Sequence, residues 1–124
     1  MNVVDSSGWL EYFAGSIRAA NFAKAIEDTQ RLIVPSIVLL EVFKRLAELR
    51  GEEAALRGVA AMHQGRVVAL DAALALAAAT VGRAHKLPLA GSIVYATALR
   101  ERATLWTQDA DFDGLPAVRY FAKA

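Results

Sequence analysis

No cysteine occurs in this chain of 124 residues. Its absence excludes a disulfide framework, a cysteine-based zinc site, an iron–sulfur cluster and a thiol nucleophile. A chain without cysteine also suits a reducing compartment, and we therefore expect a cytoplasmic location.

Long apolar runs are missing as well. The longest stretch free of formal charge, residues 87–99, contains 13 residues, whereas about 20 are needed to cross a bilayer. The N-terminus lacks a basic segment followed by an apolar run, so we expect no signal peptide and no membrane association. The formal net charge of +1 gives no general attraction to nucleic acid, and any such binding needs a local patch.

Several widespread catalytic motifs are absent too. The sequence contains no phosphate-binding loop, no Gly-x-Ser-x-Gly elbow and no glycine-rich dinucleotide fingerprint. These absences argue against a nucleotide-triphosphate motor, a serine hydrolase and a dehydrogenase. His63 and His85 fall on different predicted helices and show no metal-binding spacing.

What the sequence does contain is an alternation of short β-favouring runs and longer helical patterns. The predicted strands are 2–4, 31–34, 66–70, 104–107 and 118–120, and the predicted helices are 7–14, 19–27, 36–50, 52–63, 72–85 and 91–102. Ser36 is expected to cap helix 36–50, with Leu49 on its apolar stripe. Helix 91–102 is expected to be amphipathic, and residues 108–114 to form a polar loop. This order predicts an α/β fold: one domain over residues 1–124 with a mostly parallel central sheet of four to five strands flanked by helices. Ligands of such sheets bind beyond the carboxyl ends of the strands.

Acidic residues follow two of the predicted strands directly. Asp5 comes after the first strand, and Asp109 and Asp111 come after the strand that ends at Thr107. Glu41 interrupts an apolar run within a predicted helix, where an unpartnered charge is costly to bury. Carboxylates that converge stay ionised together only beside a cation, and a set of oxygen ligands suits Mg²⁺ or Mn²⁺.

Each acid also has a simpler interpretation. Asp5 is suited to cap a helix, Glu41 to face solvent on a tilted helix, and residues 109–114 to form a solvated turn closed by Asp-Gly. The residues alone leave these alternatives open, and the joint placement of the acids is what favours a site.

Five segments carry a resemblance to a known family. They are Val4-Asp5-Ser6-Ser7 with Trp9-Leu10, Pro35-Ser36-Ile37-Val38-Leu39-Leu40-Glu41-Val42, Leu87-Pro88-Leu89-Ala90-x-Ser92-Ile93, Ala96-Thr97-Ala98, and Thr107-x-Asp109-x-Asp111-Phe112. In order, spacing and total length the chain resembles the PIN-domain ribonucleases, in particular the VapC toxins of bacterial toxin–antitoxin pairs.

The resemblance implies an endoribonuclease that depends on Mg²⁺ or Mn²⁺ and attacks RNA phosphodiesters with a metal-activated water. Carried over, Asp5, Glu41 and Asp109 fall on three of the family's acidic positions, with Asp111 as an auxiliary acid. Thr107 falls on the neighbouring hydroxyl position, and Ser6 and Lys44 are further auxiliary candidates. Lys44 is suited equally to contact phosphate and to pair with Glu41. The implied partners are a VapB-like antitoxin, the RNA substrate and a second copy of the chain in a homodimer.

One position departs from the family pattern. Gly91 stands where family members place a further metal-ligating aspartate, and glycine offers no side-chain oxygen. Three explanations remain open: an engineered change that protects the expression host, a decayed toxin that still binds partners, or a gap filled by water or a displaced carboxylate. We therefore expect an impaired nuclease, and the alternative is a non-catalytic PIN-like module that binds an antitoxin or RNA.

Overall fold

A computed structural model describes residues 1–123 and contains five strands and six α-helices in that range. The strands are β1 (Asn2–Val4), β2 (Leu32–Pro35), β3 (Arg66–Val68), β4 (Thr104–Thr107) and β5 (Val118–Tyr120). The α-helices are α1 (Ser6–Ala14), α2 (Ala20–Glu27), α3 (Ser36–Arg50), α4 (Glu52–Met62), α5 (Ala72–His85) and α6 (Leu89–Arg100), and short 3-10 turns include η3 (Ala110–Phe112). The predicted α/β architecture is confirmed.

The five strands form one sheet in the order β3-β2-β1-β4-β5, and every neighbouring pair is parallel. The first strand of the chain is thus the central strand of the sheet. Because all strands run the same way, the residues that follow β1 and β4 emerge at one edge. The expectation of a mostly parallel sheet is confirmed.

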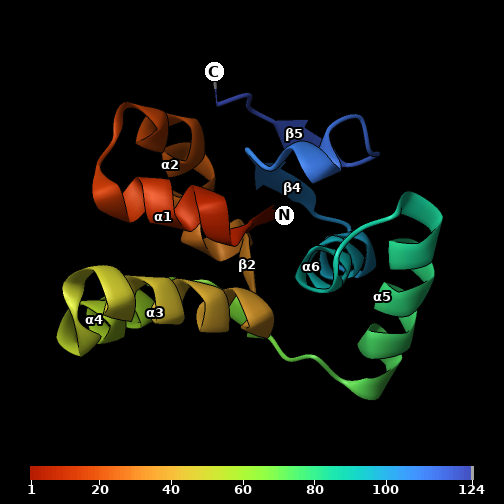
Figure 1. The fold of residues 1–124 in the computed structure, drawn as a ribbon, viewed down its shortest axis with the longest axis horizontal. Coiled ribbons are helices and arrows are strands. Elements are labelled where there is room, and N and C mark those ends of the chain that lie inside the picture. The colour runs from red at the N-terminus through yellow and green to blue at the C-terminus, as the bar shows by residue number, and fades with distance from the viewer. Residues whose placement is uncertain (124) are drawn as a thin grey trace.

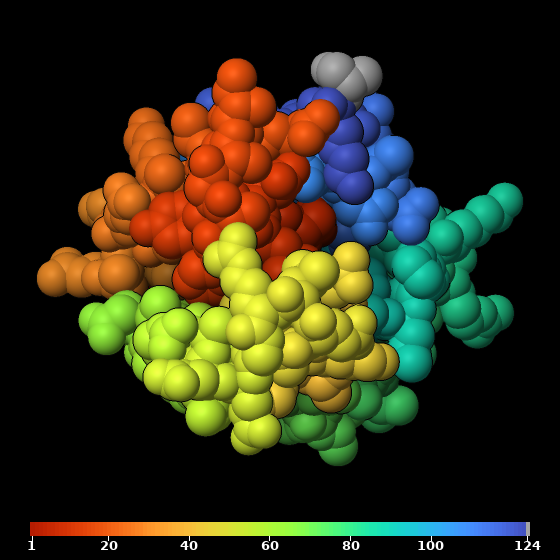
Figure 2. Space-filling model, turned by 60° about the vertical axis from the view of Figure 1, so that its left-hand side comes forward, coloured from red at the N-terminus to blue at the C-terminus, as the bar shows by residue number. Residues whose placement is uncertain are grey.

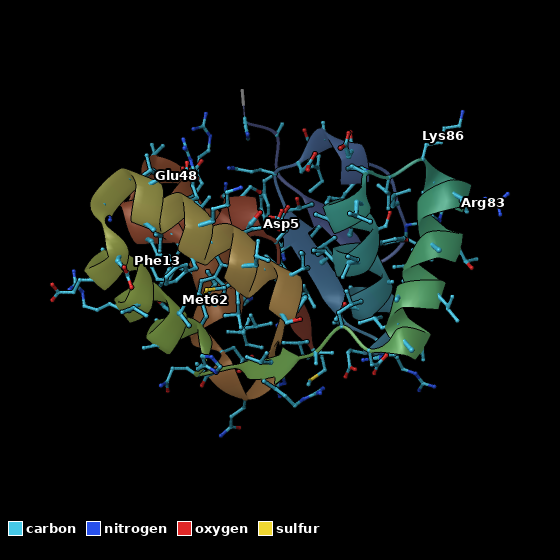
Figure 3. All side chains as sticks on the ribbon, turned by 60° about the horizontal axis from the view of Figure 1, so that its bottom comes forward. Asp5, Phe13, Glu48, Met62, Arg83 and Lys86 are labelled. Atoms are coloured by element: carbon cyan, nitrogen blue, oxygen red, sulfur yellow. The ribbon has the colours of Figure 1, made fainter. Side chains whose placement is uncertain are left out.

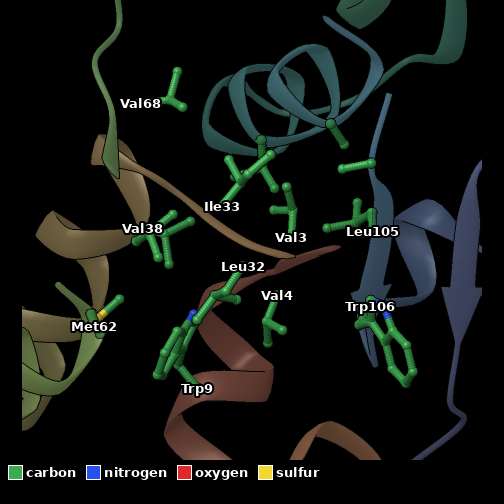
Figure 4. Close-up of a cluster of buried hydrophobic side chains, with 14 of the residues drawn as sticks. Val3, Val4, Trp9, Leu32, Ile33, Val38, Met62, Val68, Leu105 and Trp106 are labelled. Carbon is green, nitrogen blue, oxygen red and sulfur yellow. The ribbon is translucent and has the colours of Figure 1, made fainter. Parts of the chain in front are cut away.

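Alternate residues of the central strands point to opposite faces of the sheet. Val3 of β1 pairs with Ile33 and Leu105, and all three side chains point toward α6 in Figure 4. Their neighbours Val4, Leu32 and Trp106 point to the other face, toward α1. Every one of these six side chains is buried. Because both faces of these strands are covered, their sequences are continuous apolar runs and do not alternate between apolar and polar residues.

Helices cover both faces of the sheet (Figure 1). Helices α1 and α2 lie on one face, α6 lies on the other, and α3 contacts both α1 and α6. Helix α5 packs on the outer side of α6. None of the helices in residues 1–123 combines the length and the hydropathy that a bilayer crossing requires.

Helix α6 differs from the prediction in both its start and its burial. It begins at Leu89 rather than at Gly91, because the N–H of Ser92 already bonds to the carbonyl of Pro88. It is also not amphipathic: residues 92–98 are all buried, since the sheet covers one side of the helix and α5 the other. Gly91 is therefore the third residue of a helix.

Two further expectations were wrong in detail. The third strand ends at Val68 instead of residue 70, because the N–H of Leu70 bonds to the hydroxyl of Ser36 and leaves the sheet. Ser36 consequently does not cap α3, whose capping position is held by Pro35. Leu49, expected on the buried stripe of α3, is 58% exposed near the end of that helix.

Candidate acidic site at the carboxyl edge of the sheet

Asp5 follows β1 and is the N-cap residue of α1. Its carboxylate accepts hydrogen bonds from the N–H of Gly8 and the hydroxyl of Ser7, at 3.2 and 2.7 Å, both on Oδ1. The residue is only 5% exposed. The capping interpretation of Asp5 is therefore correct, and the cap lies at the edge where the sheet predicts a ligand. Figure 3 shows Asp5 in the interior, whereas Arg83 and Lys86 point outward from the far end of α5.

Thr107, the last residue of β4, joins the two acids that follow neighbouring strands. Its hydroxyl donates to Asp5 Oδ2 at 2.6 Å and accepts the N–H of Asp109 at 2.9 Å. Thr107 is completely buried. Because the hydroxyl is held by both partners, it ties the end of β4 to the start of α1.

Asp109 lies two residues beyond the end of β4 and is partly buried. Its Oδ1 accepts the N–H of Asp111 at 2.9 Å, which makes Asp109 the cap of η3. Asp111 thus meets Asp109 through its backbone, and its own side chain is exposed. The charge of Asp111 is not among those that raise the pKa of Asp5 or Glu41.

Glu41 reaches the same region from the second turn of α3. Burial raises the pKa of its carboxyl, and the carboxylates of Asp5 and Asp109 raise that pKa further, while a hydrogen bond from Ser6 opposes the shift. The charges of Asp5 and Asp109 thus both act on the carboxyl group of Glu41. Lys44 forms no ion pair with Glu41 within residues 1–123 and is exposed.

The electrostatics of Asp5 agree with this picture. Burial is the largest effect and raises the pKa of the Asp5 carboxyl; hydrogen bonds from Thr107, Ser7 and Gly8 lower it, and the charge of Asp109 raises it again. Because the charge of Asp109 acts on both Asp5 and Glu41, a cation beside these acids would stabilise their ionised forms.

The acidic side chains are of the chemical type that binds a divalent cation, but they are not close enough together to hold one. The donors are carboxylate oxygens, the type that Mg²⁺ and Mn²⁺ prefer. Within the described part of the chain, however, no three histidine, cysteine or acidic side chains stand close enough together to hold an ion as they are. Both oxygens of Asp5 also accept hydrogen bonds from protein donors.

Gly91 adjoins this neighbourhood from α6. A Cβ atom built on Gly91 would lie 3.3 Å from Phe112 Cζ and 3.5 Å from the nearest ring atoms of Pro88, and the backbone is in a region open to any residue. A Cβ atom at this position is therefore accommodated if Phe112 shifts by a few tenths of an ångström. The adjacent residue Ala90 lines a hollow shared with Glu41.

Two hollows flank the acids on the surface where the N-terminal segment, α3 and the segment after β4 adjoin (Figure 2). The first, of about 560 Å³, is lined mainly by Ser7, Gln108, Asp109, Tyr120 and Lys123. The second, of about 410 Å³, is lined by Ile37, Leu40, Glu41, Lys44, Arg45, Glu48 and Ala90. Lys44 therefore faces the same hollow as Glu41, and each hollow brings cationic residues beside an acid.

Sequence reasoning missed two residues of this neighbourhood. Gln108, placed in a polar loop, is in fact buried and bonds through its side chain to Glu11 of α1 at 3.0 Å. This bond joins segments 97 residues apart in the sequence, so no local pattern could have indicated it.

Comparison with solved structures supports the fold over nearly its whole length. A toxin–antitoxin complex from Klebsiella pneumoniae contains a similar chain, with a TM-score of 0.83 at 22% identity, covering 98% of this chain and 99% of that one. VapC20 of Mycobacterium tuberculosis, described as a sarcin–ricin loop cleaving toxin, has a TM-score of 0.76 at 19% identity, with 94% and 95% covered. A DNA-bound VapBC from Salmonella typhimurium has a TM-score of 0.72 at 15% identity, with 98% and 96% covered.

The sequence was also compared with curated proteins and with family descriptions. No curated protein matched. Residues 3–118 match the PIN domain family, and this span runs from β1 to β5 and includes every acid discussed above. The parallel sheet with its acids at the carboxyl edge is thus accounted for: this chain belongs to the PIN domain family.

Proposed function

We propose that this protein is a VapC-like ribonuclease toxin whose activity is impaired in the present sequence. The observation that carries the proposal is the link Asp5–Thr107–Asp109 at the carboxyl edge of a PIN-domain sheet, with Glu41 raised in pKa by both acids. The similar structures named above, a toxin–antitoxin complex and a sarcin–ricin loop cleaving toxin, support the toxin role.

Asp5, Glu41 and Asp109 would hold Mg²⁺ or Mn²⁺, with Asp111 as an auxiliary. A divalent cation at such a site supplies a water nucleophile at neutral pH and stabilises charge on a phosphate. Other residues of the chain orient the three acids. Thr107 and Ser7 orient the Asp5 carboxylate, the backbone of Asp111 orients Asp109, and Ser6 contacts Glu41. Lys44, free of an ion pair in the described range, is suited to contact a phosphate of the RNA rather than Glu41.

Gly91 is the proposed cause of the impairment. It lies in the first turn of α6, where the helix dipole favours an anion, next to Phe112 of the segment that follows Asp109, and it contributes no oxygen.

The second candidate is a non-catalytic PIN-like module that binds an antitoxin or RNA. The same gap at Gly91 favours it, since binding partners need no complete metal site. For either function we propose a VapB-like antitoxin as partner, following the complexes named above, and a second copy of the chain.

The Gly91→Asp variant separates the two candidates. It should cleave total RNA in the presence of Mg²⁺ or Mn²⁺ and stop when EDTA is added. Gly91→Asn is the matched control, because it adds a side chain of the same size without the charge and should not restore cleavage. A second control, Glu41→Gln in the Gly91→Asp background, should abolish the restored activity. If folded Gly91→Asp protein leaves RNA intact under all metal conditions, the nuclease proposal is wrong.

A further inference from the structure

Helix α5 exposes an apolar surface at the outer edge of the molecule, on the side of α6 away from the sheet (Figure 1). Residues 72–82 contain no charged side chain, and among residues 72–80 only Leu74 and Ala78 are buried. Leu76, in the middle of this stretch, is 73% exposed. The outer side of a surface helix normally carries charged or polar residues, and an apolar one is typical of a surface that a partner covers.

A hollow of about 530 Å³ lies between α5 and α6 and adjoins this surface. Its lining includes Leu70, Ala75, Ala79 and Arg83 together with Leu89 and Ile93 of α6. Leu89 is 83% exposed and Leu70 is 43% exposed. Leu76, Ala79 and Arg83 recur at helical spacing, so the exposed leucine of α5 and the hollow belong to one continuous surface. We call this surface, made of Leu70, Leu76, Ala79, Arg83 and Leu89, the α5 face.

The charges of α5 lie at its two ends. Asp71 is the N-cap residue, and Arg83 lies in the last turn. The Asp71 carboxylate pairs with Arg100 at 3.2 Å, yet its side chain is still 57% exposed. Arg83 forms no ion pair within residues 1–123, and it points outward in Figure 3. The α5 face therefore has an acid at one end, a free cation at the other and an uncharged middle.

This charge pattern is complementary to itself when the helix direction is reversed. If the α5 helices of two copies lie side by side and antiparallel, Asp71 of each copy comes next to Arg83 of the other. In that register Leu76 lies opposite Ala78 of the other copy, beside its hollow. A twofold axis makes both sets of contacts at once, because it uses the same surface on both copies. An acidic segment of another protein would pair with Arg83 but would place a like charge near Asp71, so a second copy fits the pattern better.

We propose that two copies of this chain associate through the α5 face, with their α5 helices antiparallel about a twofold axis. The inference rests on the second copy proposed above, and it assigns that copy a surface and an orientation. Each dimer then contains two ion pairs between Asp71 and Arg83 and buries Leu76 of both copies.

The first test is the mass of the full chain in solution, measured by analytical ultracentrifugation over a range of concentrations. The wild-type chain should form a dimer. Leu76→Glu should raise the dissociation constant at least about tenfold, because it places two carboxylates in an apolar interface. The matched control is Leu56→Glu, which alters a leucine that is 55% exposed on α4 and should leave the constant unchanged.

Two results of this measurement overturn the proposal. A dimer that Leu76→Glu leaves intact shows that the copies associate through another surface. A wild-type chain that stays monomeric at every concentration shows that the α5 face serves a different partner.

A double-mutant cycle tests the antiparallel orientation without any change at Leu76. Arg83→Gln should raise the dissociation constant about three- to tenfold, since each dimer loses two exposed ion pairs. In an Asp71→Asn background, which keeps a helix cap, the same change should have little further effect. Within one copy these residues are 12 positions apart, about 18 Å along the helix, so physiological salt screens their direct interaction. Coupling between them therefore reports contact between copies, and full additivity of the two substitutions contradicts the antiparallel arrangement.

The mass measurement is independent of RNA cleavage. If Gly91→Asp cleaves RNA as a monomer, the proposed interface is wrong and the nuclease stands. If Leu76→Glu separates the dimer but Gly91→Asp never cleaves, the interface stands and the nuclease is wrong.

Discussion

Thr107 and Asp5 are 102 residues apart in the sequence, yet the hydroxyl of one donates to the carboxylate of the other at 2.6 Å. The same hydroxyl accepts the N–H of Asp109. Because Thr107 is completely buried, water cannot replace either bond. The relative position of the two acids therefore depends on a single oxygen atom.

Thr107→Val should reveal this dependence. Valine has nearly the same shape as threonine but leaves Asp5 Oδ2 and the N–H of Asp109 without their partner. We expect the free energy of unfolding to fall by about 2 kcal/mol, since each buried group left unpaired is costly. Urea unfolding at neutral pH measures the effect, and Thr107→Ser, which keeps the hydroxyl, should lose much less. Similar losses in the two variants would show that the methyl group matters more than the hydrogen bonds.

Asp5→Asn should change how stability depends on pH. Burial raises the pKa of Asp5 in the folded chain above the reference value of 3.8, so the folded state binds its proton more tightly than the unfolded state does. The contribution of Asp5 is therefore most favourable below pH 3.8 and is lost as the pH rises through the raised pKa.

Asparagine does not titrate and still caps a helix. The variant should accordingly gain stability relative to the wild-type chain as the pH increases from acid to neutral, with hydrogen bonding of Gly8 retained. Thermal unfolding across this pH range measures the difference. A gap between the two proteins that is constant with pH contradicts the raised pKa.

Gly8 and Gly91 should respond in opposite ways to alanine. A Cβ on Gly8 would lie 2.6 Å from Val4 Cγ1 and 2.7 Å from Phe22 Cδ1, both fully buried, and overpacking of this kind costs about 1–3 kcal/mol. On Gly91 the closest atom is Phe112 Cζ at 3.3 Å, and alanine is favoured over glycine within a helix by roughly 1 kcal/mol. Chemical denaturation should therefore show a marked loss for Gly8→Ala and little change or a small gain for Gly91→Ala. Equal losses would mean that α6 cannot accept a side chain at that position.

Gly91→Asp should bind Mn²⁺ at least about tenfold more tightly than the present chain, a factor already typical of partners outside the ligand shell. Isothermal titration calorimetry measures both affinities. Glu41→Gln in the Gly91→Asp background should reverse most of the gain, because it removes one carboxylate of the proposed set. If both chains bind Mn²⁺ equally, Gly91 is not a missing ligand position.

The sheet and the position of the acids could be predicted because both follow from local pattern and one general rule. Short apolar runs such as Asn2–Val4 and Thr104–Thr107 identify strands, and parallel strands bring the residues behind them to one edge. Asp5 and Asp109 were named on this basis, and Glu41 was named because it interrupts an apolar run in a helix. The charge of Asp109 acts on both Asp5 and Glu41, which agrees with the expected convergence. Whether they bind an ion stays a prediction.

Features that depend on contacts distant in sequence were not predictable in the same way. The sequence of helix α6 predicts an amphipathic helix. Residues 92–98 are nevertheless all buried, because the helix lies between the sheet and α5. The third strand ends early because the Ser36 hydroxyl binds the N–H of Leu70. The bond between Gln108 and Glu11 likewise joins segments that no local pattern relates.

The position of the first strand at the centre of the sheet has a consequence for synthesis of the chain. β1 can pair with β2 early, but its other neighbour, β4, leaves the ribosome only when most of the sequence has been translated. A nascent chain therefore carries Asp5 and Glu41 long before Asp109 and its supporting threonine arrive. The two halves of the acidic edge can therefore come together only when translation of the chain is nearly complete.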